Sequence, residues 1–196
     1  MDSSDVHRAV AAMTRTLGPH VERDWRVRAG PLEWSCWTTA AHVAHDLLAY
    51  AGQLAGRAAD GYLPFDLTVR PDASPAAVLT VVEAAAGLLG GALDRADPGT
   101  RAWHWGPTDP GGFAAMGVTE ILVHTYDIGA GLALDWLPPE ELAARALARL
   151  FPDAPPGDPA RALLWCTGRI EFDGRARRTS WSWRASMDEE EAEGKR

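Results

Sequence analysis

Residues 113–134 read FAAMGVTEILVHTYDIGAGLAL, an apolar segment with Glu120, His124 and Asp127 in its middle. The apolar spacing predicts one helix over this segment. Residues spaced four and then three apart lie on one face of a helix, so these three side chains are stacked a turn apart. Because apolar residues are interleaved with them, we expect this face to turn partly inward. A buried stripe of groups that bind metals or move protons indicates a functional site.

Helices also dominate the rest of the prediction. Five further segments have apolar residues at helical spacing and are predicted as helices: 5–17, 38–56, 75–96, 138–150 and 159–168. Ser3 or Ser4 can cap the first, and Ser74 followed by Pro75 opens the third in the order that helices favour. Four of the six helices are long, and so are their connections. This predicts an all-α four-helix bundle with crossover connections and short extra elements near the carboxyl end.

The connections are rich in tryptophan, proline and glycine. Residues 99–112 (GTRAWHWGPTDPGG) are predicted to be a loop that either walls a pocket or only covers the end of the bundle. His104 lies in this loop between two tryptophans and is assigned no role. Residues 169–185 (RIEFDGRARRTSWSWRA) alternate enough to predict a short hairpin or an extended tail that folds back. The domain prediction is therefore a bundle over 1–170 and a short carboxyl-terminal segment over 171–196.

The 196-residue chain has 27 acidic and 19 basic residues, a formal net charge of −8. An acidic balance argues against nucleic acid as a partner, because phosphate binding needs a basic surface. No apolar run approaches the roughly 20 residues that span a bilayer and no signal sequence is seen, so we expect a soluble, cytoplasmic protein with no membrane partner. Cys36 and Cys166 lie beside tryptophans and are predicted to be buried, reduced thiols. The acidic end, MDEEEAEGKR, is predicted to be a disordered tail, and a homodimer stays open.

Glu120 and His124 offer two side chains that bind zinc or another first-row divalent metal. A catalytic site needs a third ligand, and the segment AAHVAHDLL supplies His42 and His45, three residues apart and roughly on one helix face. Facing helices of a bundle commonly build such sites. Two histidines and one carboxylate leave coordination positions open for water or substrate. Without a metal, His45 would be a core histidine bonded to a carbonyl, and Asp127 the partner of an arginine.

Three stretches resemble the DinB-like superfamily, and within it the mycothiol-dependent maleylpyruvate isomerase branch found in actinobacteria. CWTTAAHVAHDL resembles the family's helix entry, in which the histidine eight residues after a tryptophan binds the metal; counted from Trp37, this is His45. TEILVHTYDIGAGLAL resembles its E-x-x-x-H-x-x-D helix, which implies metal ligation by Glu120 and His124 and places Asp127 at the family's nearby aspartate. ALLWCTGRIEF resembles its LLW-x-T-G-R segment near the carboxyl end.

The resemblance implies a DinB-like bundle with a metal at His45, Glu120 and His124, zinc first and nickel or another first-row ion as the alternative. It also implies a mycothiol-like thiol cosubstrate, whose thiolate attacks a small electrophilic substrate and leads to transfer or isomerisation. Asp127 is expected to hold the second ring nitrogen of a ligand histidine. Arg169 is expected to clamp a substrate anion or, as the plainer alternative, to hold the tail through a salt bridge.

We expect one part of the family's architecture to be absent. The branch carries a further carboxyl-terminal α/β domain that contributes to the substrate site, and too few residues follow Arg169 for such a domain. This weakens the expectation of maleylpyruvate isomerisation more than that of a thiol-dependent metal site. Two alternatives remain: a metal-dependent hydrolase with metal-bound water as the nucleophile, and a non-catalytic bundle that binds a small ligand.

Overall fold

The computed structural model describes residues 1–186, and the predicted acidic tail at 187–196 lies outside the described residues. The elements in chain order are α1 (Ser3–Leu17), the 3₁₀-helix η1 (Gly18–His20), α2 (Cys36–Gly56), α3 (Pro75–Arg95), β1 (Ala102–Trp103), β2 (Pro107–Thr108), α4 (Pro110–Gly131), α5 (Glu140–Leu150) and α6 (Pro159–Cys166). Each predicted helix is found, with ends that differ from the prediction by about three residues at most. The all-α prediction is confirmed.

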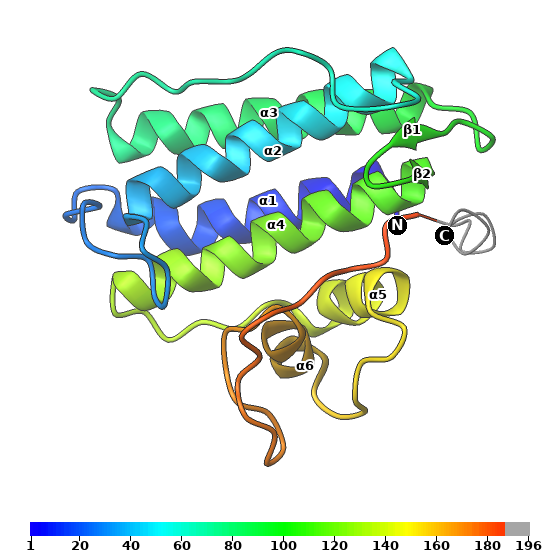
Figure 1. The fold of residues 1–196 in the computed structure, drawn as a ribbon. Coiled ribbons are helices and arrows are strands. Elements are labelled where there is room, and N and C mark those ends of the chain that lie inside the picture. Colours follow the sequence, from blue (N-terminus) through cyan, green and yellow to red (C-terminus); the bar gives the residue numbers. More distant parts are fainter. Residues whose placement is uncertain (187–196) are drawn as a thin grey trace.

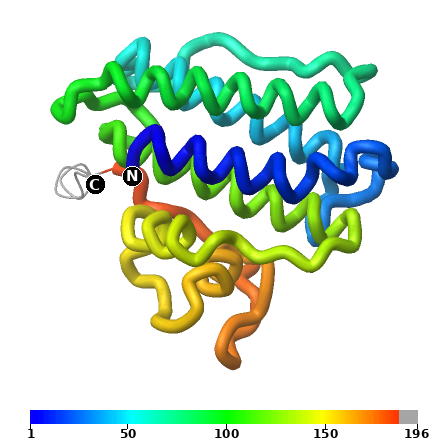
Figure 2. The backbone as a smooth tube through the Cα atoms, turned by 180° about the vertical axis from the view of Figure 1, so that it is seen from behind, coloured from blue at the N-terminus to red at the C-terminus, as the bar shows by residue number. Residues whose placement is uncertain are grey.

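The four long helices form a bundle in which α2 and α3 lie above α1 and α4 (Figure 1). Both α1 and α2 pack on α3 and α4, so α1 and α2 lie diagonally across the bundle. The view from behind shows α1 running between α3 and α4 (Figure 2). Because α1 and α2 are consecutive in the chain but diagonal in the bundle, and so are α3 and α4, residues 21–35 and 96–109 must each cross one end of the bundle. These are the long crossover connections that the sequence predicts.

The most enclosed helix is α4, which packs on α1, α2 and α5. Its buried residues occupy every side of the helix, which explains why its sequence is apolar almost throughout. At its end, a Cβ at Gly131 would collide with the carbonyl oxygen of Arg28, so the crossover connection passes directly over the glycine backbone. Cys36, the first residue of α2, accordingly lies with its Sγ 3.7 Å from the carbonyl oxygen of Ile128. The two helices that carry the candidate ligands therefore run antiparallel, with the start of α2 beside the end of α4.

The prediction that Ser3 or Ser4 caps the first helix is wrong. Asp2 caps α1, because its carboxylate accepts hydrogen bonds from the backbone N–H groups of Ser4 and Asp5, and the Asp5 carboxylate accepts one from the backbone of Asp2. A carboxylate at this position also interacts favourably with the helix dipole. Ser74 caps α3, as predicted.

Within the described residues, α3 is long and apolar enough by composition to cross a membrane, which corrects the expectation that no segment of the chain is. Its most apolar window has a mean hydropathy of 1.8, and 50% of that window is buried inside the bundle. The helix packs along α2 and α1. Packing in the bundle core accounts for this apolar composition.

After α4 the chain builds a smaller layer, in which α6 packs on α5 and α5 on α4. Residues 167–186 then return along α4 towards the hairpin of β1 and β2, as the prediction of an extended tail that folds back requires (Figure 1). Arg149 on α5 hydrogen-bonds to the backbone of this carboxyl-terminal segment. Its Nη1 donates to the carbonyl oxygen of Arg184 at 2.9 Å, and its Nη2 donates to the carbonyl oxygen of Ala185 at 2.7 Å. The segment is thereby held against the bundle.

Candidate metal centre and its cavity

Three metal-binding side chains from α2 and α4 meet inside the bundle. His42, Glu120 and His124 each place one donor atom within 4.8 Å of the other two. Glu120 Oε2 lies 3.1 Å from His124 Nε2 and 3.7 Å from His42 Nε2. Around an ion with bonds of about 2.0–2.2 Å, neighbouring donors lie roughly 3.3 Å apart. The spacing and the two-nitrogen, one-oxygen donor set therefore fit a first-row divalent ion.

The structure brings His42, and not the predicted His45, to Glu120 and His124. His45 Nδ1 lies 2.7 Å from Asp66 Oδ1 in the connection between α2 and α3. Two helical residues three apart point about 60° away from each other around the axis. Because α4 lies on the side of α2 that carries His42, His45 turns to the connection instead. Its role as a ligand stays a prediction that this geometry does not support.

The spacing from tryptophan to histidine was ambiguous in the sequence. Trp37 precedes His45 by eight residues, and Trp34 precedes His42 by the same number. In the structure the ring of Trp34 packs against the imidazole of His42, with centroids 4.8 Å apart. The same signal, counted from the earlier tryptophan, would have found the third donor.

Asp127 lies behind His124 and is fully buried. Its Oδ2 is 2.9 Å from His124 Nδ1, which leaves Nε2 facing Glu120. Arg169 donates to the same carboxylate, from Nη2 at 2.8 Å and from Nε at 3.2 Å, and its Nη1 donates to the carbonyl oxygen of Thr167. All three guanidinium nitrogens therefore bind the protein itself. The geometry is that of the plainer alternative for Arg169, an ion pair, and the pair fixes the ring of His124.

The ionisable groups of this cluster shift one another's pKa. Burial alone would lower the pKa of His124, but hydrogen bonds to Asp127 and Glu120 raise it to about 9. Burial alone would raise the pKa of Glu120, yet its bonds with His124 and His42 hold that pKa well below its usual value. Burial and the nearby Glu120 raise the pKa of Asp46, whose Oδ2 lies 3.3 Å from His42 Nε2, to about 6. Carboxylates are concentrated here at neutral pH, which favours a bound cation.

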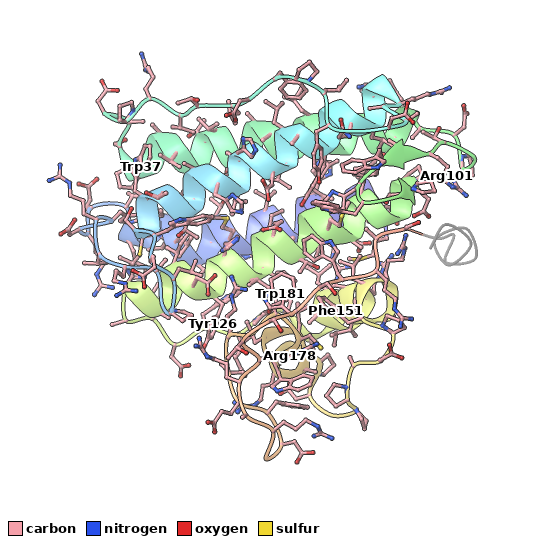
Figure 3. The ribbon with its side chains drawn as sticks, in the orientation of Figure 1. Trp37, Arg101, Tyr126, Phe151, Arg178 and Trp181 are labelled. Atoms are coloured by element: carbon pink, nitrogen blue, oxygen red, sulfur yellow. The ribbon has the colours of Figure 1, made fainter. Side chains whose placement is uncertain are left out.

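The donor cluster opens onto a cavity of about 1360 Å³ between α2, α4, the hairpin and the carboxyl-terminal segment. Much of the lining is aromatic: Trp34, Tyr50, Tyr62, Phe65, Trp105, Trp181 and Trp183. Of the two alternatives for residues 99–112, the structure shows a pocket wall. Figure 3 shows Trp181 below α4 on the side of α5, where its ring lies 6.3 Å from that of Phe151. Small-molecule pockets commonly occupy about 300–1,000 Å³, so this one can hold two small molecules together.

The protein is a four-helix bundle with crossover connections, and two histidines and one carboxylate form a cluster that faces its interior. These features define a class of helical proteins with a candidate metal centre. The sequence profile of one family, described as the mycothiol maleylpyruvate isomerase N-terminal domain, matches residues 6–129. This range contains all three donors and nearly the whole bundle. The chain belongs to this family, and the predicted resemblance is confirmed. Comparison with curated proteins and with solved structures found no match.

Proposed function

We propose that the protein is a metal-dependent enzyme that uses a low-molecular-weight, mycothiol-like thiol as the nucleophile in transfer to, or isomerisation of, a small electrophilic substrate. One observation carries the proposal: the donors His42, Glu120 and His124 open onto a cavity large enough for a thiol and a second small molecule. Family membership supports the thiol. The nitrogen and oxygen donors suit zinc first, with nickel or another first-row ion as the alternative.

The chain's own cysteines do not supply the nucleophile. Cys36 and Cys166 are buried, and neither lies in the described lining of the cavity. Burial raises the pKa of Cys36 to about 11 and raises that of Cys166 as well. Neutral pH leaves such thiols protonated and unreactive. A thiol-dependent reaction in this cavity therefore needs a thiol from outside the chain.

The residues of the site have distinct tasks in this proposal. His42, Glu120 and His124 would hold the ion, which supplies the positive charge that deprotonates a thiol of ordinary pKa near 8.5. Asp127 holds His124 with Nε2 turned to the site, and Arg169 holds the Asp127 carboxylate in place. Aromatic side chains would line the space in which the thiol binds. The partners we propose are a thiol and a small substrate, with no nucleic acid and no membrane, in the reducing cytoplasm.

The test begins with metal content. Protein purified without chelator or polyhistidine tag is compared with the double variant His42→Ala, His124→Ala by elemental analysis. We expect near-stoichiometric zinc or nickel in the wild type and none in the variant. Turnover of 1-chloro-2,4-dinitrobenzene by the metal-loaded protein should then require an added thiol such as mycothiol, above the rate with the variant. Ester hydrolysis without thiol would favour the hydrolase alternative. Absence of metal from both proteins, even after divalent ions are added back, would leave a ligand-binding bundle.

A further inference from the structure

A group of polar and aromatic side chains occupies the part of the cavity between α2 and the hairpin. The rings of Tyr50 on α2 and Tyr62 in the following connection both lie edge-on to the ring of His104 in the hairpin, with centroids 5.7 and 5.8 Å from it. All three residues line the cavity. We call Tyr50, Tyr62 and His104 the phenol corner; none of them belongs to the metal centre.

The hydrogen bonds of His104 fix its tautomer. The indole Nε1 of Trp183 lies 3.4 Å from His104 Nε2, and an indole nitrogen only donates, so Nε2 is the acceptor. The imidazole hydrogen is therefore on Nδ1, which lies 2.8 Å from the Tyr62 hydroxyl and donates to it. Burial lowers the pKa of His104 to about 4, which keeps this neutral form at pH 7. The Tyr62 hydroxyl thus accepts from His104 and keeps its own hydrogen for another acceptor.

Tyr50 presents a second hydroxyl hydrogen that can be donated to a ligand. The residue is 4% exposed, and its hydroxyl has no hydrogen-bond partner within residues 1–186. The fully enclosed polar atoms without a partner in that range belong to Asp5, Thr100 and Thr108, so the Tyr50 oxygen is not sealed in the core. It opens onto the cavity that Tyr50 lines. Burial and the nearby carboxylates of Glu120 and Asp46 raise its pKa, so the hydroxyl stays protonated and is a donor.

The charges around the cavity select against an anion. The two arginines in the described lining, Arg169 and Arg184, are paired with Asp127 and Asp153. Three carboxylates line the cavity: Asp46, Asp66 and Glu120. A divalent ion would not offset three negative charges, and a bound thiolate would add a fourth. A carboxylate substrate would meet net negative charge here, whereas an uncharged acceptor would meet two phenol donors.

We propose that the phenol corner binds the carbonyl oxygen of an uncharged, planar substrate, with the Tyr50 and Tyr62 hydroxyls as the two donors. The large aromatic side chains at the rim supply flat apolar contacts for the rest of such a molecule: Trp34, Phe65, Trp105 and Trp181. This inference rests on the proposed function, because it names the class of electrophile that the thiol would meet. It separates this protein from an enzyme for dicarboxylates.

The test is direct binding of three matched probes, measured by calorimetry and by ligand-observed NMR without any thiol. Acetophenone carries the carbonyl oxygen, benzoate carries a charge on the same ring, and ethylbenzene has no oxygen. Each is titrated into zinc-loaded and chelator-treated protein. We expect acetophenone to bind about tenfold more tightly than ethylbenzene in both forms, and benzoate to bind more weakly than acetophenone in both.

Conservative variants assign the donors. Tyr50→Phe and Tyr62→Phe should each weaken acetophenone binding about five- to tenfold, the loss of one hydrogen bond, and leave ethylbenzene binding unchanged. Tyr126→Phe, on α4 outside the cavity lining (Figure 3), is the matched control and should change neither. Benzoate that binds the chelator-treated protein as tightly as acetophenone, or acetophenone binding that neither variant weakens, would overturn the inference.

These outcomes are separate from those of the proposed function. If the protein binds zinc and turns over an electrophile with thiol but does not discriminate among the three probes, the proposed function is supported and carbonyl binding at the phenol corner is overturned. If the protein binds the probes in the expected order but shows no thiol-dependent turnover, the phenol corner is supported as a carbonyl-binding site and the proposed thiol chemistry is overturned.

Discussion

The carboxylate of Asp127 lies 2.9 Å from Nδ1 of His124 on the same helix, one turn away, with none of its side chain exposed to solvent. The contact follows from the i, i+3 spacing, and it decides which nitrogen of the ring can face the metal centre. Because Arg169 covers the other side of the carboxylate, Asp127 is both a positioning residue and half of a buried ion pair.

Replacing Asp127 with asparagine should affect metal binding and stability together. The neutral amide in Asp127→Asn would hold His124 more weakly, so zinc affinity, measured by competition with a chromophoric chelator, should fall about 10–100-fold. Arg169 would lose its counter-ion in a buried position, which should lower the free energy of unfolding in urea by about 3 kcal/mol. The matched control is the exposed Asp135→Asn, which should change neither quantity. Unchanged zinc affinity in Asp127→Asn would show that the contact does not support the site.

Single substitutions of the two histidines of α2 should have different effects on zinc content. His42→Ala removes a donor and should abolish stoichiometric zinc, while His45→Ala removes a contact to Asp66 and should leave zinc content unchanged. Elemental analysis of both proteins after identical purification measures this. The opposite result, with zinc lost only in His45→Ala, would restore the third ligand that the family's motif implies.

Zinc affinity should rise with pH. The pKa of His124 is raised to about 9 in the folded protein, against an ordinary value near 6.5, so at neutral pH a bound ion must displace its proton. Between pH 6.5 and 9 we therefore expect affinity to rise by up to about tenfold per pH unit. Calorimetry in buffers of different ionisation enthalpy should show about one proton released at pH 7.

The metal-free protein should show the opposite trend in stability. A raised folded-state pKa means that protonated His124 stabilises the fold fully below pH 6.5, and that this stability is lost as the pH rises through about 9. Urea unfolding across this interval measures the loss. His124→Gln should flatten both the stability profile and the proton release; a pH profile that survives this substitution would assign it to another group.

The crossover at the end of α4 can be tested at its glycine. Gly131→Ala would drive a Cβ into the carbonyl oxygen of Arg28, which should cost about 1–3 kcal/mol in the free energy of unfolding. Gly18→Ala is the control, because Gly18 has helical φ and no atom within 4 Å of an added Cβ, and it should be neutral or slightly stabilising. Equal stability of the two variants would show that the connection does not depend on this close approach.

Short stretches of the sequence determine much of this protein's secondary structure. Each helix follows from apolar periodicity and cap residues such as Ser74, which act within a few positions of the chain. The same local spacing places Glu120, His124 and Asp127 on one face of α4, so this half of the candidate site needed no tertiary information. The cap of α1 was missed because Asp2, Ser3 and Ser4 all have suitable side chains, and only the hydrogen bonds distinguish them.

Tertiary packing decided which histidine of α2 lies beside Glu120 and His124 on α4. His42 and His45 have equivalent chemistry and equivalent spacing from a tryptophan, and the choice between them depends on which side of α2 faces α4. The connection before α2 passes directly over the backbone of Gly131, a long-range contact far from either histidine in the sequence. Arg169 likewise turned to Asp127, 42 residues away in the chain, because a buried carboxylate requires a partner. The local sequence determines helices and the residues along one face, while long-range contacts determine which faces meet.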